Sequence, residues 1–132
     1  MRNTLSIALF LGLLAQPLTG HHSVSVSNNP ERLVTLQGSI AQIDWMNPHV
    51  AITLSARRTN GNIGVERVQI AAPNGLIRRG FDRNLIKVRD PVTIEAWPAR
   101  DEPRFAGVGP SGRTLILSDG RRFDVSDQFG AR

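Results

Sequence analysis

Apolar and polar residues alternate in short runs along most of the chain, and a period of two is the pattern of half-buried β-strands. The longest run covers residues 33–45, where Leu36 and Ile40 have the same parity whereas Ile43 has the other. A change of parity inside a strand indicates a β-bulge or a sharp bend, and we expect it at Gly38. The sequence therefore predicts a long, bent first strand.

Five shorter runs continue this alternation and are separated by turn-forming residues. The pairs Asn60-Gly61 and Asp119-Gly120 are typical of tight hairpin turns. Residues 99–112 are rich in proline, glycine and charge, which predicts a long loop. The five further predicted strands are residues 49–55, 65–71, 92–97, 114–117 and 122–125.

One segment departs from the strand pattern. Residues 73–80 begin with Pro-Asn and end with glycine, which predicts a short helix between the third and fourth strands. Asn74 can cap the free amides of the first turn, and Gly80 suits the position after the helix end. A second helical turn is predicted at residues 82–86.

The order of these elements predicts the fold class. Three strands, a short helix and two or three more strands are typical of a mainly β fold, a small OB-like barrel of five to six strands. A long bent first strand suits such a barrel because it can serve both sides. An SH3-like barrel and a small sandwich are the alternatives. We expect residues 21–132 to form this single domain.

The first twenty residues do not belong to that pattern. Residues 1–20 carry a basic start, an uncharged apolar core and a polar, turn-prone end, which is the plan of a secretory signal peptide. The apolar core is shorter than the about 20 residues that span a membrane, so we expect cleavage and no remaining membrane span. A cut after Gly20 would make His21 the first residue, and a cut after Ala15 is the alternative. The expected location is the periplasm or the extracellular space.

Composition narrows the possible chemistry. The chain has no cysteine, which excludes disulfides, thiolate metal sites and cysteine catalysis. Its formal net charge of +5 could attract anionic partners, but a solvated arginine-rich surface is the explanation that we favour. Export and the low aromatic content make nucleic acid an unlikely partner. No arrangement of nucleophile and base stands out, so we favour a binding protein over an enzyme.

Residues 45–49, Trp-Met-Asn-Pro-His, join the first two predicted strands. Trp45 is large enough to fill the core against Trp97, and Asn47 can hydrogen-bond its own loop before the proline. The alternative is a ligand groove beside the histidine, in which the indole stacks on a ligand. We assign Trp45, Asn47 and Arg79 as candidate ligand-binding residues. Arg79 belongs to a basic group at residues 78–89 that also suits the end of a short helix.

The three histidines are candidate metal ligands. After a cut at Gly20, the amine and imidazole of His21 would chelate one metal ion, and His49 or His22 would add a second imidazole. Such a site of three nitrogens suits Cu(II). The alternative is that His21 and His22 form a solvated chain end and that His49 closes a barrel opening. The cofactor expectation is therefore Cu(II) or another transition metal, or none.

Several short motifs together resemble one family of small exported bacterial proteins of unknown function. They are the start His21-His22-Ser23, the Trp-x-Asn-Pro-His segment at residues 45–49 and a Pro-Asn-x-Leu-x-Arg-x-Gly segment at residues 73–80. An ending of the Leu-x-Asp-Gly-Arg type is present at residues 117–121. The chain departs from the family at Phe81, where the family has tryptophan, and at residues 88–91, where it has Pro-Gly-Asp. The resemblance implies an exported, mainly β domain and no established activity.

These observations lead to three functional hypotheses. The first is a small exported binding or accessory protein that holds copper or another transition metal through an N-terminal histidine. The second is a metal-independent structural or interaction module that binds a peptide, a small ligand or a partner protein on the barrel face. The third, less favoured, is a copper-dependent redox enzyme.

Overall fold

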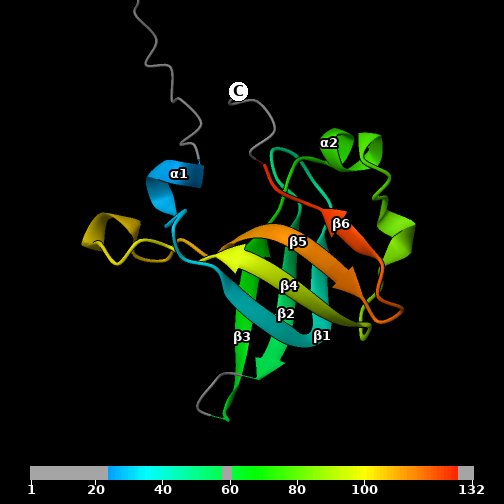
Figure 1. Ribbon diagram of the computed structural model, residues 1–132, viewed down its shortest axis with the longest axis horizontal. Coiled ribbons are helices and arrows are strands. Elements are labelled where there is room, and N and C mark those ends of the chain that lie inside the picture. Colours follow the sequence, from blue (N-terminus) through cyan, green and yellow to red (C-terminus); the bar gives the residue numbers. More distant parts are fainter. Residues whose placement is uncertain (1–23, 58–60, 128–132) are drawn as a thin grey trace, which may run out of the picture.

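Strand β1 (Val34–Asp44) organises the fold because it pairs on both of its edges (Figure 1). Its first half pairs antiparallel with β4 (Pro91–Trp97), and its second half pairs antiparallel with β2 (Ala51–Arg57). The computed structural model describes residues 24–57 and 61–127. In these residues, β1 belongs to both sides of a closed sheet, as we expected of a long, bent first strand.

The sheet closes into a ring through β3 (Ile63–Gln69) and β5 (Ser111–Leu117), where Gln69 pairs in parallel with Ser111. The ring order is β1-β2-β3-β5-β4, and β6 (Arg122–Asp124) adds to the free edge of β5. Helix α2 (Pro73–Arg78) lies between β3 and β4 in the chain. The prediction of a mainly β, OB-like barrel with a short helix between the third and fourth strands is confirmed.

All six predicted strands are present, and the largest difference in their bounds is at β5, which begins at Ser111 rather than at residue 114. The predicted helical turn at residues 82–86 is a 3-10 turn at Arg83–Leu85. The predicted loop contains a second 3-10 turn at Pro103–Phe105. No helix in the described ranges is long and apolar enough to cross a membrane.

The bulge in β1 lies three residues beyond its predicted place. Ile40 pairs with Leu54 and Gln42 with Thr53, so Ala41 is the additional residue. The prediction of a bulge at Gly38 was therefore wrong, and this glycine has another role. A Cβ atom at Gly38 would lie 2.2 Å from the carbonyl oxygen of Ser55, so its absence lets β2 approach β1. 

The core is built around one aromatic ring, Phe81, which has no exposed surface. The ring stacks on Trp45 at a centroid distance of 6.3 Å and meets the edge of Phe123 at 5.2 Å. Trp45 thus packs on Phe81, and the expected packing against Trp97 was wrong. The barrel supplies the aliphatic part of the core, including Ile40, Ile52, Leu54, Val68, Ile70, Ile94 and Leu115.

Phe81 reaches this position because α2 ends in a Schellman motif. The N–H of Gly80 donates to the carbonyl oxygen of Ile77, and the N–H of Phe81 donates to that of Leu76, both at 3.0 Å. Gly80 has φ +79°, so its predicted stop role is confirmed. Leu76 and Phe81 are both fully buried, and they occupy the two positions between which this motif commonly has an apolar contact.

The start of α2 differs from the prediction. Ala72 precedes the helix and makes no side-chain cap, whereas Asn74 lies inside the first turn. The expected Asn74 cap is therefore wrong. Pro73 occupies the start of the helix, where a missing N–H costs nothing and the fixed φ angle suits the helix.

The chain before β1 is anchored rather than loose. Residues Val24–Ser27 form one helical turn, α1. The side chain of Asn28, which is 3% exposed, donates to the carbonyl oxygens of Trp97 at 3.0 Å and Gly109 at 3.2 Å. Asn28 thus fixes this segment to both ends of the loop between β4 and β5. His21 and His22 lie outside the described residues.

Candidate functional site

A hollow of about 310 Å³ opens beside α2, at one end of the barrel. Three segments that are distant in the sequence surround it: the loop after β1, the region of α2, and the two residues after Val125. Its size lies at the lower end of the range of small-ligand pockets, about 300–1,000 Å³. The lining residues are Asn47, Ala71, Ala72, Asn74, Gly75, Arg78, Arg79, Ser126 and Asp127.

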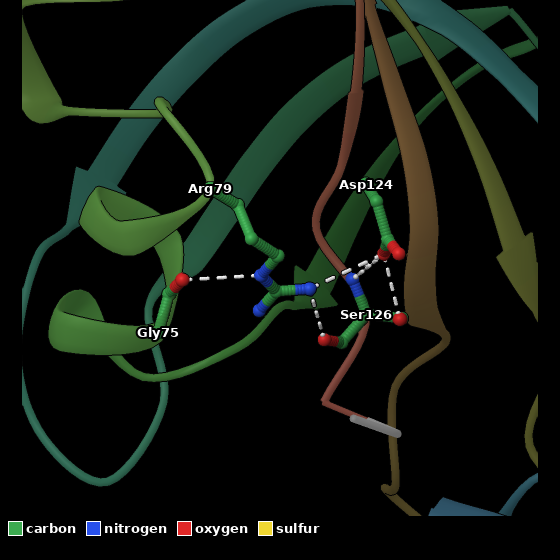
Figure 2. Close-up of polar contacts among 4 residues, drawn as sticks. All are labelled: Gly75, Arg79, Asp124 and Ser126. Atoms are coloured by element: carbon green, nitrogen blue, oxygen red, sulfur yellow. Dashed lines mark hydrogen bonds and ion pairs between the residues drawn. The ribbon is translucent and has the colours of Figure 1, made fainter. Parts of the chain in front are cut away.

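Arg79 holds two of these segments together (Figure 2). Its Nε donates to the carbonyl oxygen of Gly75 at 3.0 Å, and its Nη1 donates to that of Ser126 at 2.8 Å. Nη1 also lies 3.3 Å from Oδ1 of Asp124. The Schellman turn fixes the backbone at Arg79, so its guanidinium joins α2 to the chain after β6. The Nε and Nη1 donors bind the protein itself, which makes Arg79 a positioning residue of the site.

The carboxylate of Asp124 completes this network. Its Oδ1 accepts from the Ser126 N–H at 2.9 Å and from the Ser126 hydroxyl at 2.7 Å (Figure 2). Ser126 is 6% exposed. The N–H and the hydroxyl of Ser126 both donate to Asp124, so this serine helps to fix the chain that follows β6.

His49 lies at the rim of the hollow, where its side chain contacts Asp127, one of the lining residues. Its Nδ1 lies 3.5 Å from Oδ2 of Asp127, and the two side chains are 29% and 37% exposed. The next residue, Val50, exchanges backbone hydrogen bonds with Ile70 and Ala71 at 2.8 and 3.2 Å. These bonds place the histidine beside the segment that leads into α2. A partly exposed imidazole next to a carboxylate can bind a proton or a metal ion.

The structure gathers some of the predicted site residues and separates others. Asn47 and Arg79 line the same hollow, and His49 contacts Asp127 at its rim. Trp45 does not line it, because its indole packs on Phe81. 

Sequence reasoning missed three groups around the hollow. Asn74 was expected to be a helix cap, and Ser126 and Asp127 were not singled out. No local pattern marks the last two, because they follow an ordinary strand and reach the site only through the closure of the barrel. The Leu-x-Asp-Gly turn before β6 was the nearest available signal.

Metal ligation at this site rests on few groups. In residues 24–57 and 61–127, no set of three or more histidine, cysteine, aspartate or glutamate side chains is gathered so that it could hold a metal ion. His49 and Asp127 are a pair of possible ligands. A complete site would need further donors, and His21 and His22 lie outside the described part of the chain.

Several carboxylates of the described surface are held in the ionised form. Hydrogen bonds from Gln42 and then Arg67 lower the pKa of Asp44, which ends β1. A hydrogen bond from Arg122 lowers the pKa of Glu95. Groups of this kind act as ion-pair partners, whereas a general acid needs a pKa raised toward neutrality.

A larger hollow, about 610 Å³, is lined by the middle of β1, the end of β2, the starts of β3 and β4 and the end of β5. Hydroxyl groups from four strands or their ends contribute to its lining, and Arg57 is the charged residue there. It contains no histidine and no carboxylate among its lining residues. The candidate site is therefore the smaller hollow beside α2, where titratable groups meet.

Comparison with known proteins gives one result. A model of the family of unknown function DUF6152 matches residues 10–108, which is most of the chain. The chain therefore belongs to this family, as the resemblance to a family of unknown function led us to expect. No curated protein and no solved structure matches the chain.

Proposed function

We propose that this member of the family DUF6152 is an exported, non-enzymatic binding protein that holds a small zwitterionic ligand beside α2. The observation that carries the proposal is the meeting of Asn47, Arg78 and Asp127 around one hollow of about 310 Å³. These residues come from three separate segments, and the Arg79 network fixes two of those segments relative to each other.

The charges of the lining define the ligand. Arg78 is exposed and has no ion-pair partner among the described residues, so it offers a positive charge to a carboxylate. Asp127 offers a negative charge and is 37% exposed, which suits an ammonium group. The carboxamides of Asn47 and Asn74 add donors and acceptors between them. A free amino acid or a short peptide carries both charges at a spacing that a hollow of this size accepts.

The hydrogen bonding of the lining supports a preformed binding site. The Ser126 hydroxyl is occupied by Asp124, and the donors Nε and Nη1 of Arg79 are occupied by backbone and carboxylate oxygens. These hydrogen bonds hold the walls of the hollow in shape before any ligand binds. Export is supported by the signal-like pattern of residues 1–20.

The test is an NMR titration of the ¹⁵N-labelled mature chain with L-alanine, L-alaninamide and N-acetyl-L-alanine. We expect L-alanine to shift the signals of residues 71–79 and 126–127, and both analogues to bind more weakly because each lacks one charge. Arg78→Gln and Asp127→Asn should each weaken binding, whereas Arg83→Gln, on an exposed turn, serves as the matched control. Equal shifts from all three compounds, or none at these residues, would overturn the proposal.

A second candidate function is Cu(II) binding, favoured by the approach of His49 to Asp127. The two side chains lie 3.5 Å apart and are both partly exposed, so they could supply two ligands without unfolding any strand. After cleavage at Gly20, the amine and imidazole of His21 would add two nitrogens, a set that Cu(II) prefers. Binding would release the proton of the amine and would therefore weaken at low pH.

Copper titration followed by electron paramagnetic resonance tests this second candidate. One tight equivalent with a nitrogen-ligand spectrum is expected in mature protein, and its loss is expected in His49→Ala and in protein with one extra residue before His21. Arg78→Gln separates the two candidate functions, because it should weaken L-alanine binding and removes no proposed ligand of copper. Copper binding unchanged by the extra residue would exclude the N-terminal site.

A further inference from the structure

A second hollow, also about 310 Å³, lies on the outer face of β4, β5 and β6. Ser126 lines both this hollow and the one beside α2, so both hollows adjoin the chain that follows β6. The other residues differ completely between the two. Those of the second hollow are Trp97, Arg113, Thr114, Arg122, Phe123 and Asp124.

A β-bulge turns Arg113 toward this hollow. Glu95 pairs with Thr114 and Ala96 pairs with Gly112, so Arg113 is an additional residue in β5 with no partner in β4. A bulge redirects side chains and is common next to binding sites. Arg113 and Thr114, which follow each other in the chain, consequently both line the hollow. The carbonyl oxygen of Arg113 accepts from the N–H of Val125 at 2.9 Å, which fixes the bulge.

Among the charges near this hollow, one is left without compensation. Nη2 of Arg122 donates to both carboxylate oxygens of Glu95, at 3.0 and 3.1 Å. The guanidinium of Arg113 makes no hydrogen bond or ion pair within the described residues, and it attracts Glu95 only at longer range. Asp124, also at the rim, is matched by Arg79. The hollow therefore presents one positive charge that the protein does not compensate.

Aromatic surface lies next to that charge. Trp97 ends β4 and is half-buried, so part of its indole is open to solvent. Its backbone oxygen accepts from Asn28, which holds the end of the strand in place. Phe123, also half-buried, is fixed from below by the ring of Phe81 at 5.2 Å. Rigid aromatic side chains of this kind bind flat apolar groups with little loss of conformational entropy.

We infer that this hollow is a second binding site, for a small organic carboxylate that carries a flat apolar group. The carboxylate meets the guanidinium of Arg113, and the apolar group packs on the indole of Trp97. The bulge places the charge beside the ring, and the Glu95–Arg122 pair keeps Arg122 in place. Because no residue except Ser126 is shared with the hollow beside α2, the inference stands independently of the proposed function.

Three probes separate the two interactions that the site requires. Benzoate carries both the charge and the ring, benzamide carries the ring without the charge, and acetate carries the charge without the ring. We expect benzoate to shift the Trp97 indole N–H signal and the backbone signals of residues 112–114 in the ¹⁵N-labelled mature chain. Benzamide should bind about fivefold more weakly, since an exposed ion pair contributes that much at most. Acetate should also bind more weakly than benzoate, because it lacks the ring that packs on Trp97.

The matched variants are Arg113→Gln and Arg83→Gln, which remove one exposed guanidinium each. Arg113→Gln keeps the backbone bond to Val125, so the fold is retained, and benzoate binding should weaken about fivefold. Arg83→Gln should leave it unchanged. Benzoate shifts of equal size in both variants, or shifts confined to residues 71–79, would overturn the inference, and neither result depends on whether L-alanine binds beside α2.

Discussion

The Nη1 atom of Arg79 lies 2.8 Å from the backbone oxygen of Ser126, and this contact joins the end of α2 to the chain that leaves the barrel. Ser126 in turn donates twice to Asp124, which also meets Arg79. The candidate pocket therefore has walls that are fixed by one cross-connected network. Because the Arg79 side chain is only 20% exposed, these bonds are partly shielded from water.

Replacing Arg79 by methionine keeps the apolar stem of the side chain and removes the guanidinium. We expect the free energy of unfolding to fall by about 2 kcal/mol, because the Ser126 carbonyl and the Asp124 carboxylate lose a charged donor. Urea denaturation measures the change. Arg83→Met, on the exposed 3-10 turn, should change stability by less than about 0.5 kcal/mol. Equal losses in the two variants would show that Arg79 does not hold the site together.

A side chain at Gly38 should not fit the barrel. In Gly38→Ala the new Cβ would lie 2.2 Å from the Ser55 oxygen and 2.8 Å from the Cα of Ala56, both backbone atoms that cannot move independently of β2. We expect a loss of about 3 kcal/mol in the free energy of unfolding. Ser39→Ala, at the exposed next position, is the control and should be nearly neutral. A Gly38→Ala protein of wild-type stability would contradict the observed approach of β1 and β2.

Tryptophan at position 81, the residue expected from the family resemblance, should not be neutral in this chain. Phe81 has no exposed surface and touches both Trp45 and Phe123, so the larger indole must displace a ring. We expect Phe81→Trp to lower the free energy of unfolding by about 1–3 kcal/mol. Ile77→Trp, in the last turn of α2 at a residue that is 53% exposed, should have little effect. A Phe81→Trp protein that is more stable than the wild type would contradict the close packing observed around Phe81.

Stability should fall with acidification partly through Glu95. The hydrogen bond from Arg122 lowers the pKa of Glu95 below its ordinary value of 4.5, so the folded state favours the ionised carboxylate. The resulting stabilisation is complete above that ordinary value and is lost as the pH falls through the lowered pKa. Glu95→Gln should therefore lose less stability than the wild type between pH 6 and pH 3 in urea denaturation. Glu31→Gln is the control. An unchanged pH dependence in Glu95→Gln would show that Glu95 does not contribute to the loss of stability in acid.

The mature protein recovered from a periplasmic fraction should begin at His21. Intact-mass measurement distinguishes this start from Gln16, which a cut after Ala15 would give, and from Met1. A start at His21 is the condition for the proposed copper site, because its amine must be free. A start at Gln16 would leave the pocket beside α2 unchanged and would exclude the N-terminal metal site.

Three residues of the segment 45–49 show which parts of the site were predictable from the sequence. The Asn-Pro-His segment marked Asn47 and His49 because a proline turn between two strands brings polar groups to a barrel end. Trp45 in the same segment was assigned to ligand stacking or to packing on Trp97, and the second assignment is wrong because its indole packs on Phe81. An indole next to a polar turn has no local signal that distinguishes core from groove, because the partner ring comes from another element.

The alternation of apolar residues determined the number of strands, and the position of the Pro-Asn…Gly segment determined the helix between the third and fourth. Both are local properties, since a strand has a period of two and a glycine at positive φ ends a helix wherever it stands. Tertiary structure alone decided that Asp127 meets His49, that Arg79 meets Ser126 and that a bulge turns Arg113 outward. These contacts depend on the register between strands distant in the chain, and register is fixed only when the barrel closes and buries its core.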